Sequence, residues 1–223
     1  MKKLPPFSAI IFDLDGLVLD TETTYFIAWQ QAAETMGYDF SLLATHTLSG
    51  LHYQSLIKVL QASFGEDFDL QRFNQLSGQC WRDYVQEFGI AKKHGFDELL
   101  AVIENLNIPF CLATNSAEKN ARECLALAGL QQTFSVIISR DDVENGKPAP
   151  DIFLTAAERL QHSIAQCLVL EDSLVGIAAA QAAGAIPVLI PSAVSIAESE
   201  LSQNVAVFGD LNQVAQLIGN KSL

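Results

Sequence analysis

Residues 10–22 read IIFDLDGLVLDTE, an apolar run that ends at Asp13, with Asp15 and Gly16 close behind. A short run of β-branched and aromatic residues is typical of a buried strand. Ligands of an open parallel sheet bind beyond the carboxyl ends of its strands, so both carboxylates are expected at a binding edge. Two carboxylates this close repel each other unless a cation or a proton compensates. Hard oxygen ligands suit Mg²⁺, and the glycine permits a sharp turn near a ligand.

An Asp-x-Asp-Gly segment also occurs in calcium-binding loops and in ordinary turns. A calcium loop needs oxygen ligands at several later positions, but Leu17, Val18 and Leu19 follow here. The segment therefore becomes specific only together with partner residues later in the chain.

Composition limits the partners of the chain. It has 223 residues, of which 49% are hydrophobic and 17% charged, as expected for a chain with a well-buried core. The formal net charge of −13 argues against nucleic acid or an anionic membrane as a partner. It does not exclude an anionic substrate, because a metal ion and one lysine can reverse the sign of the charge locally.

The apolar runs and the cysteines indicate the compartment. No apolar run reaches the ~18 residues that a membrane span needs. The four cysteines include no Cys-x-x-Cys pair, and Cys111 and Cys167 lie in apolar runs that are typical of reduced core residues. We therefore expect a soluble, cytoplasmic protein without a membrane partner, and we expect it to be a monomer.

The order of the predicted elements indicates the fold. Residues 22–92 contain helical patterns without a convincing strand, whereas strands and helices alternate from residue 93 onward. Such alternation produces a parallel sheet. We predict an α/β fold: a doubly wound, Rossmann-like parallel sheet formed by residues 1–21 and 93–223, with an all-helical cap of residues 22–92 inserted after the first strand.

Further polar residues follow the later predicted strands. They are Thr114 and Asn115, then Lys147, then Glu171 with Asp172. The order of DLDG, TNS, GKPAPDIF and EDSLVGIAAAQAAG resembles the haloacid dehalogenase-like (HAD) superfamily, and more narrowly its β-phosphoglucomutase and phosphatase branch, in which a helical cap follows the first motif. The resemblance covers nearly the whole chain, and four motifs in this order are much more specific than any one of them.

The resemblance implies a role for each residue that would act on a phosphate ester. Asp13 is then the nucleophile that forms an aspartyl-phosphate, and Asp15 is the general acid and base. Thr114 hydrogen-bonds the transferring phosphoryl group with the Asn115 amide nearby, although the same Thr-Asn-Ser segment could simply cap the next helix. Lys147 neutralises the phosphate and holds the nucleophile in place.

The resemblance also implies an Mg²⁺ site. Its ligands would be Asp13, the backbone carbonyl of Asp15, Asp172, and Glu171 directly or through water. The alternative is an acidic pair that only caps a helix, and the presence of Asp13 makes that alternative weaker. Ser173 is interpreted as a helix-capping residue.

Substrate specificity is expected from the helical insertion, because the four motifs recognise only phosphate and metal. The segment Ser49–Tyr53 is the candidate: Gly50 permits a close approach of the loop, and His52 and Tyr53 offer polar tips on ring bodies. Alternatively, both rings pack only against the helices of the insertion. Mutases of this branch carry an arginine about where Tyr53 stands and a histidine about where Tyr25 stands, so the chain lacks groups that would hold a second phosphate.

Three functions are compatible with these residues. The first is a magnesium-dependent phosphatase acting on a small phosphorylated metabolite, such as a sugar phosphate, through an aspartyl-phosphate. The second is a β-phosphoglucomutase-like phosphosugar mutase, which the missing arginine and histidine disfavour. The third is a phosphate-binding protein that has kept the fold without catalysis, which the complete set of motif residues disfavours.

Overall fold

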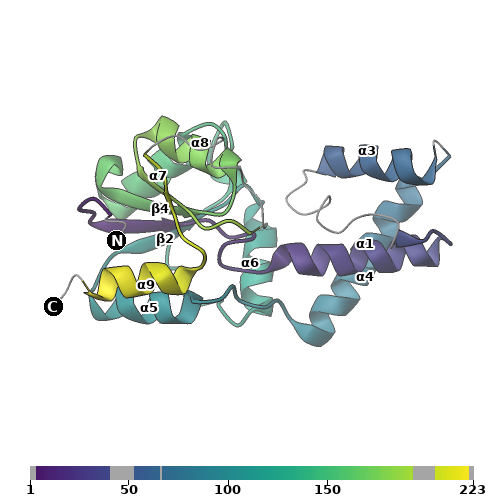
Figure 1. Ribbon diagram of the computed structural model, residues 1–223, viewed down its shortest axis with the longest axis horizontal. Helices are drawn as coiled ribbons and strands as arrows, with labels where there is room; N and C mark the ends of the chain where they lie inside the picture. The colour runs from purple at the N-terminus through teal and green to yellow at the C-terminus, as the bar shows by residue number, and fades with distance from the viewer. Residues whose placement is uncertain (1–3, 41–52, 66, 193–203, 221–223) are drawn as a thin grey trace. The chain divides into compact units, whose positions relative to one another are not determined.

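The computed structural model describes residues 4–40, 53–65, 67–192 and 204–220. Contacts divide the chain into two compact units, one formed by Met1–Asp20 with Ala91–Leu223 and the other by Thr21–Ile90. The first unit contains the sheet, and the second contains helices and no strand among its described residues. Figure 1 shows the elements of both units, with most of the helices and two of the strands labelled.

Six strands form one parallel sheet in the order β3-β2-β1-β4-β5-β6. Their bounds are β1 (Ala9–Phe12), β2 (Phe110–Ala113), β3 (Ile137–Ile138), β4 (Cys167–Glu171), β5 (Ile186–Leu189) and β6 (Ala206–Val207). The chain runs outward from β1 to β3 and then returns to place β4 on the other side of β1. The strand order therefore reverses between β1 and β4, as in doubly wound folds. The predicted fold class is confirmed.

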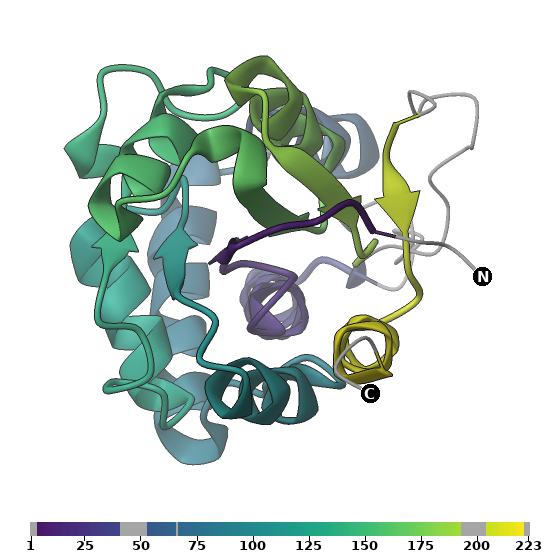
Figure 2. The same cartoon turned by 90° about the vertical axis from the view of Figure 1, so that its left-hand side faces the viewer.

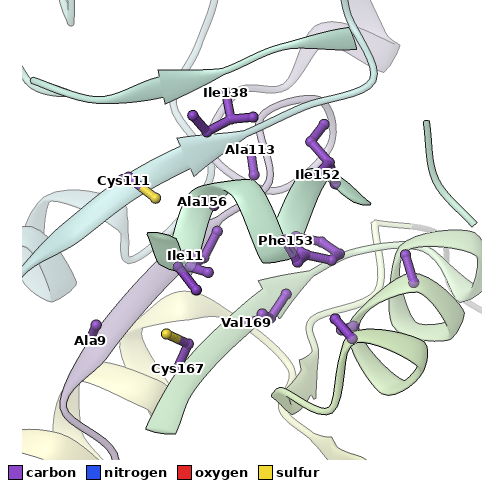
Figure 3. Close-up of a cluster of buried hydrophobic side chains, with 14 residues drawn as sticks. Ala9, Ile11, Cys111, Ala113, Ile138, Ile152, Phe153, Ala156, Cys167 and Val169 are labelled. Carbon is purple, nitrogen blue, oxygen red and sulfur yellow. The ribbon is translucent and has the colours of Figure 1, made fainter. Parts of the chain in front are cut away.

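One face of the sheet packs against α7 (Asp151–Leu160) and α8 (Leu174–Ala183). Alternate residues of the strands point to this face, because successive side chains of a strand lie on opposite sides. Figure 3 shows Ile11, Cys111 and Val169 of the strands against Phe153 and Ala156 of α7. Small alanines on α8 complete this buried cluster, so helix and sheet approach each other closely.

The other face carries α5 (Phe96–Asn105) and α9 (Leu211–Gly219), which pack against each other. Figure 2 shows these two helices on the side of the sheet opposite α7 and α8. Phe12 of β1 makes edge-to-face ring contacts here with Phe96, Phe110 and Phe134, at centroid distances of 5.9–6.2 Å. Because both faces are covered, β1 can be apolar at every position, and it is fully buried.

Short helices complete the sheet-containing unit. They are α6 (Glu118–Leu127) and the 3₁₀ turns η2 (Arg140–Asp142) and η3 (Ile164–Gln166). Ser139 caps η2, and its hydroxyl and backbone N–H both donate to the Asp142 carboxylate at 2.7 and 2.8 Å. The pKa of Asp142 is lowered by these bonds, because they favour its ionised form.

The helical unit consists of α1 (Thr21–Thr35), α3 (Tyr53–Phe64) and α4 (Leu70–Phe88) among its described residues. Its core includes Ala32, Leu60 and Phe73. The Trp81 ring nitrogen donates to the buried Thr24 hydroxyl at 3.0 Å and so ties α4 to α1. Helical spacing of apolar residues thus predicted these helices, and their packing is what stabilises them.

Within the described part of the chain, no helix combines the length and the apolar character of a membrane span. Cys111, Cys124 and Cys167 are buried, free thiols. Burial raises the pKa of Cys124 to about 12, with smaller contributions from Asp15 and Glu123. Such thiols behave as small core residues.

Removal of a buried side chain from β4 should destabilise the sheet-containing unit. Leu168 is fully buried, whereas Leu154 on α7 is 43% exposed. Leu168→Ala should lower the free energy of unfolding by about 2–5 kcal/mol, and the control Leu154→Ala by about 0.5 kcal/mol or less. Urea titration should be followed by far-UV circular dichroism, because both tryptophans lie in the helical unit. Equal losses in the two variants would contradict this account of the core.

Candidate active site

Three carboxylates meet where the strand order reverses. β1 and β4 are neighbours, and their register pairs Phe12 with Leu170. Asp13 follows β1, while Glu171 ends β4 and is followed by Asp172. The crevice beyond the strand ends at such a reversal is the usual ligand site of an open α/β sheet. The register thus gathers acidic residues that are far apart in the sequence.

Lys147 places its ammonium group among these carboxylates. Its Nζ donates to Asp13 Oδ1, to Glu171 Oε1 at 2.6 Å and to the backbone carbonyl of Ala113 at 2.9 Å. The Phe153 ring centroid lies 4.9 Å from the same nitrogen. All three charged residues are buried, with exposed fractions of 9% for the lysine, 7% for Asp13 and 0% for Glu171. All three N–H donors of the ammonium are therefore hydrogen-bonded, and the group has little contact with water.

Negative charge exceeds positive charge in this buried cluster. Burial raises the pKa of Asp13 well above its usual range; Lys147 lowers it, and Glu171, Asp172 and Asp15 raise it again. Burial alone would lower the pKa of the lysine, but the two carboxylates it touches raise that pKa instead. The lysine therefore keeps its proton, while the carboxylates lack a second positive charge that would balance them.

Asp13, Glu171 and Asp172 each offer an oxygen, and these atoms lie within 4.8 Å of one another. Carboxylate oxygens converging on one point suit a hard divalent cation, and a cation would supply the missing positive charge. The residues present therefore fit a divalent metal. Gly16 keeps the space open, since it has φ 83° and a Cβ there would lie 2.1 Å from Asp172 Oδ2.

Glu171 is held by the start of α8 as well as by the lysine. Its Oε2 accepts from the Ser173 hydroxyl at 3.0 Å and from the Ser173 backbone N–H at 3.3 Å. The same hydroxyl accepts from the Gly176 N–H at 3.0 Å, so Ser173 caps α8 as predicted. A Cβ on Gly176 would lie 1.8 Å from the Glu171 carboxyl carbon. The glycine is therefore required by the position of this carboxylate.

Asp15 receives a hydrogen bond from a residue without a predicted role in the site. The Ser116 hydroxyl donates to Asp15 Oδ2 at 2.8 Å, whereas the buried Thr114 hydroxyl is 3.5 Å from the same oxygen. Helix α6 has Ala117 as its N-cap, so the side chains of residues 114–116 do not cap it. Ser116 is the last residue of the TNS segment, and this position in a motif could have indicated that it belongs to the site.

The Asn115 side chain faces the backbone of Lys147. Its Oδ1 accepts from the Lys147 N–H at 2.8 Å, and its Nδ2 donates to the Lys147 carbonyl at 3.1 Å. The sequence predicts this amide beside the phosphate, and the structure shows its partner to be the lysine segment.

The predicted specificity segment lies largely outside the described residues. Gly50 and His52 belong to the part of the chain without a description, and Tyr53 is the first residue of α3, with its side chain likewise not described. The proposed contact of these residues with a substrate stays a prediction.

The chain matches the family model of the haloacid dehalogenase-like hydrolases over residues 10–190. It belongs to that family. The match spans both strands that carry the acidic cluster and the segment that carries Lys147.

Similar proteins of this hydrolase family include a phosphatase and a mutase. The chain is 31% identical over 176 residues to the phosphorylated carbohydrates phosphatase of Thermotoga maritima, covering 79% of this chain and 81% of the relative. It is 32% identical over 182 residues to the β-phosphoglucomutase of Bacillus subtilis, with coverages of 79% and 80%. A crystal structure of a Thermotoga maritima protein provisionally assigned as a β-phosphoglucomutase has a TM-score of 0.80 and 27% identity, covering 97% of this chain and 100% of that one.

Gly176→Ala should impair the acidic cluster of this haloacid dehalogenase-like hydrolase. The new Cβ displaces the Glu171 carboxylate from the position described above. We expect Mg²⁺ affinity, measured by isothermal titration calorimetry, to fall about tenfold or more. Gly219→Ala in α9 is the matched control, because the nearest atom to its Cβ is 3.9 Å away. Unchanged Mg²⁺ affinity in Gly176→Ala would contradict the assigned role of Glu171.

Proposed function

We propose that this hydrolase is a magnesium-dependent phosphatase of small phosphorylated metabolites, such as sugar phosphates. The observation that carries the proposal is the Lys147 ammonium held against Asp13 beside a cluster that fits a divalent cation. The phosphatase named among the similar proteins supports the reaction and the carbohydrate class of substrate. We also infer that the enzyme is a monomer and that it is cytoplasmic. Its free thiols support the second inference, because thiols stay reduced in the cytosol.

The first step transfers the phosphoryl group to the enzyme. An Asp13 carboxylate oxygen attacks phosphorus, the bond from phosphorus to the alcohol oxygen breaks, and Asp15 gives its proton to the departing alkoxide. Thr114 follows β2, and in this proposal its hydroxyl hydrogen-bonds the phosphoryl oxygens. Asp13, Glu171 and Asp172 would hold Mg²⁺, together with the Asp15 carbonyl, and the cation when bound neutralises phosphoryl charge.

The second step returns the enzyme to its starting state. Asp15, now ionised, takes a proton from water as the water oxygen attacks phosphorus. The bond between phosphorus and the Asp13 oxygen breaks, which releases inorganic phosphate. Lys147 stabilises negative charge in both steps, because it is protonated and desolvated. The Ser116 hydroxyl donates to Asp15 and so holds the carboxylate that handles the proton.

In this proposal, the helical segment of residues 22–92 is a cap that selects the substrate and excludes bulk water. The residues expected to contact the substrate are Gly50, His52 and Tyr53. Such a cap would exclude proteins and nucleic acids as substrates, and the net charge of −13 also argues against nucleic acids.

A phosphosugar mutase is the second candidate, because a β-phosphoglucomutase is as similar to the chain as a phosphatase is. Tyr25 stands about where the mutases of this branch carry a histidine. Its ring stacks on those of Trp29 and Trp81, with centroid distances of 6.2 and 5.7 Å. Tyr53 stands about where they carry an arginine. These differences favour hydrolysis. Phosphorus NMR separates the two reactions: a phosphatase releases inorganic phosphate and forms no isomeric sugar phosphate.

Asp13→Asn should reduce phosphatase turnover below about 1% of the wild-type value, because an amide does not form the acyl-phosphate. Phosphate release from a panel of sugar phosphates and from an aryl phosphate measures this. Asp97→Asn is the control, since the exposed Asp97 carboxylate pairs with Lys92 and lies outside the acidic cluster. Residual activity clearly above that level would reject Asp13 as the nucleophile.

Removal of divalent metal should abolish turnover, and Mg²⁺ should restore it. The reason is the unbalanced charge of the buried carboxylates. Ca²⁺ should inhibit, because its larger and looser coordination misplaces the oxygens. The measurement is phosphate release after exhaustive treatment with EDTA, with and without each metal added back. An enzyme that keeps full activity after EDTA treatment would contradict the metal requirement.

A further inference from the structure

The Asn115 side chain makes a two-point contact with one peptide segment. Its carbonyl oxygen accepts from the Lys147 N–H at 2.8 Å, and its amide nitrogen donates to the Lys147 carbonyl at 3.1 Å. Turning the amide over would face N–H with N–H and oxygen with oxygen, so both bonds would be lost. The orientation of the amide is therefore dictated by the lysine segment.

Further hydrogen bonds join the loop after β2 to the loop after β3. The Arg140 N–H donates to the Ser116 carbonyl at 3.1 Å, and the Glu118 N–H donates to Asp141 Oδ2 at 2.9 Å. Of the contacts between the two loops, the hydrogen bonds of Asn115 are the ones that involve the backbone of Lys147 itself. They set the position from which the lysine side chain extends to the carboxylates.

The segment before the lysine is shaped to admit the amide. Gly146 has no side chain, and a Cβ there would lie 2.6 Å from Asn115 Oδ1 and 2.8 Å from the Arg140 side chain. The Arg140 guanidinium donates to the carbonyls of Val143 and Glu144 at 2.8 and 3.1 Å, which holds the preceding turn. The missing side chain at Gly146 therefore leaves room for the Asn115 amide.

We propose that Asn115 is a positioning residue, which acts on the reaction through Lys147 and not by direct contact with the phosphate. The inference rests on the proposed phosphatase function, in which the lysine ammonium stabilises phosphoryl charge. Lys147 Nζ must reach Asp13, Glu171 and Ala113 together. A long, flexible side chain meets three acceptors at once only when its backbone is fixed, and small displacements of catalytic groups lower rates steeply.

A double-mutant cycle with Asn115→Ala and Lys147→Ala tests the proposal. Asn115→Ala alone should lower kcat between about tenfold and hundredfold. In the Lys147→Ala background, the same change should alter kcat less than about twofold, because no ammonium is left to position. A tenfold loss in both backgrounds would overturn the proposal and assign Asn115 to the phosphate directly.

Binding of inorganic phosphate to the magnesium-loaded enzyme gives a second cycle that needs no turnover. Asn115→Ala should weaken phosphate binding when Lys147 is present and leave it unchanged in the Lys147→Ala background. If Asn115→Ala does not fold, as judged by circular dichroism, Asn115→Asp enters the same cycle, since it keeps the acceptor for the Lys147 N–H and loses the donor. Weaker phosphate binding in both backgrounds would overturn the proposal.

Asn145→Ala is the matched control. It removes an amide from the loop that carries Lys147, and this amide hydrogen-bonds Asp151 at 3.1 Å instead of the lysine backbone. We therefore expect kcat to change less than about twofold. An Asn115→Ala enzyme with wild-type kcat, alongside inactive Asp13→Asn and impaired Lys147→Ala enzymes, would reject this inference and leave the phosphatase proposal intact. A Lys147→Ala enzyme with wild-type turnover would reject both.

Discussion

A buried ammonium among carboxylates is the interaction on which the rest of the site depends. Burying a charge is costly unless it is paired and hydrogen-bonded. Lys147 meets this condition with Asp13, Glu171 and a backbone carbonyl. Either carboxylate without the lysine would be a desolvated anion, and the lysine without them would lose its proton more easily. The acidic excess that remains is what suits the site to a cation.

The parallel sheet brings the two buried carboxylates together directly at the ends of its strands. β1 and β4 are adjacent, so Asp13 and Glu171 leave neighbouring strands at the same edge. β2 lies on the other side of β1, which brings Thr114 to that edge too. The covered faces of the sheet hold these strands rigidly, and rigid elements keep a site more precise than loops do. The charged residues are then held further by the loop contacts of Lys147 and, at Glu171, by the start of α8.

Much of the fold and of the candidate site could be predicted before the structure was known. Alternating strands and helices indicated a doubly wound sheet, and DLDG, Lys147 and Glu171-Asp172 were singled out together. The contacts of the TNS segment were not predicted. Ser116 bonds to Asp15 and the Asn115 amide bonds to the lysine backbone. A sequence motif shows which residue types are present, but it does not show which of several polar groups a side chain will hydrogen-bond.

The class of fold, the candidate charged residues and their order along the chain can all be inferred from the amino-acid sequence alone. Periodicity and local composition carry this information, because burial on a strand or a helix recurs at a fixed spacing. The folded structure is needed to show which charges pair, which glycine leaves room for which carboxylate, and which groups the Asn115 amide bonds. Gly176 meets Glu171 through the packing of α8 beside β4, and Asn115 meets Lys147 across two loops. Such contacts depend on strand order and register, which bring residues together from distant parts of the chain.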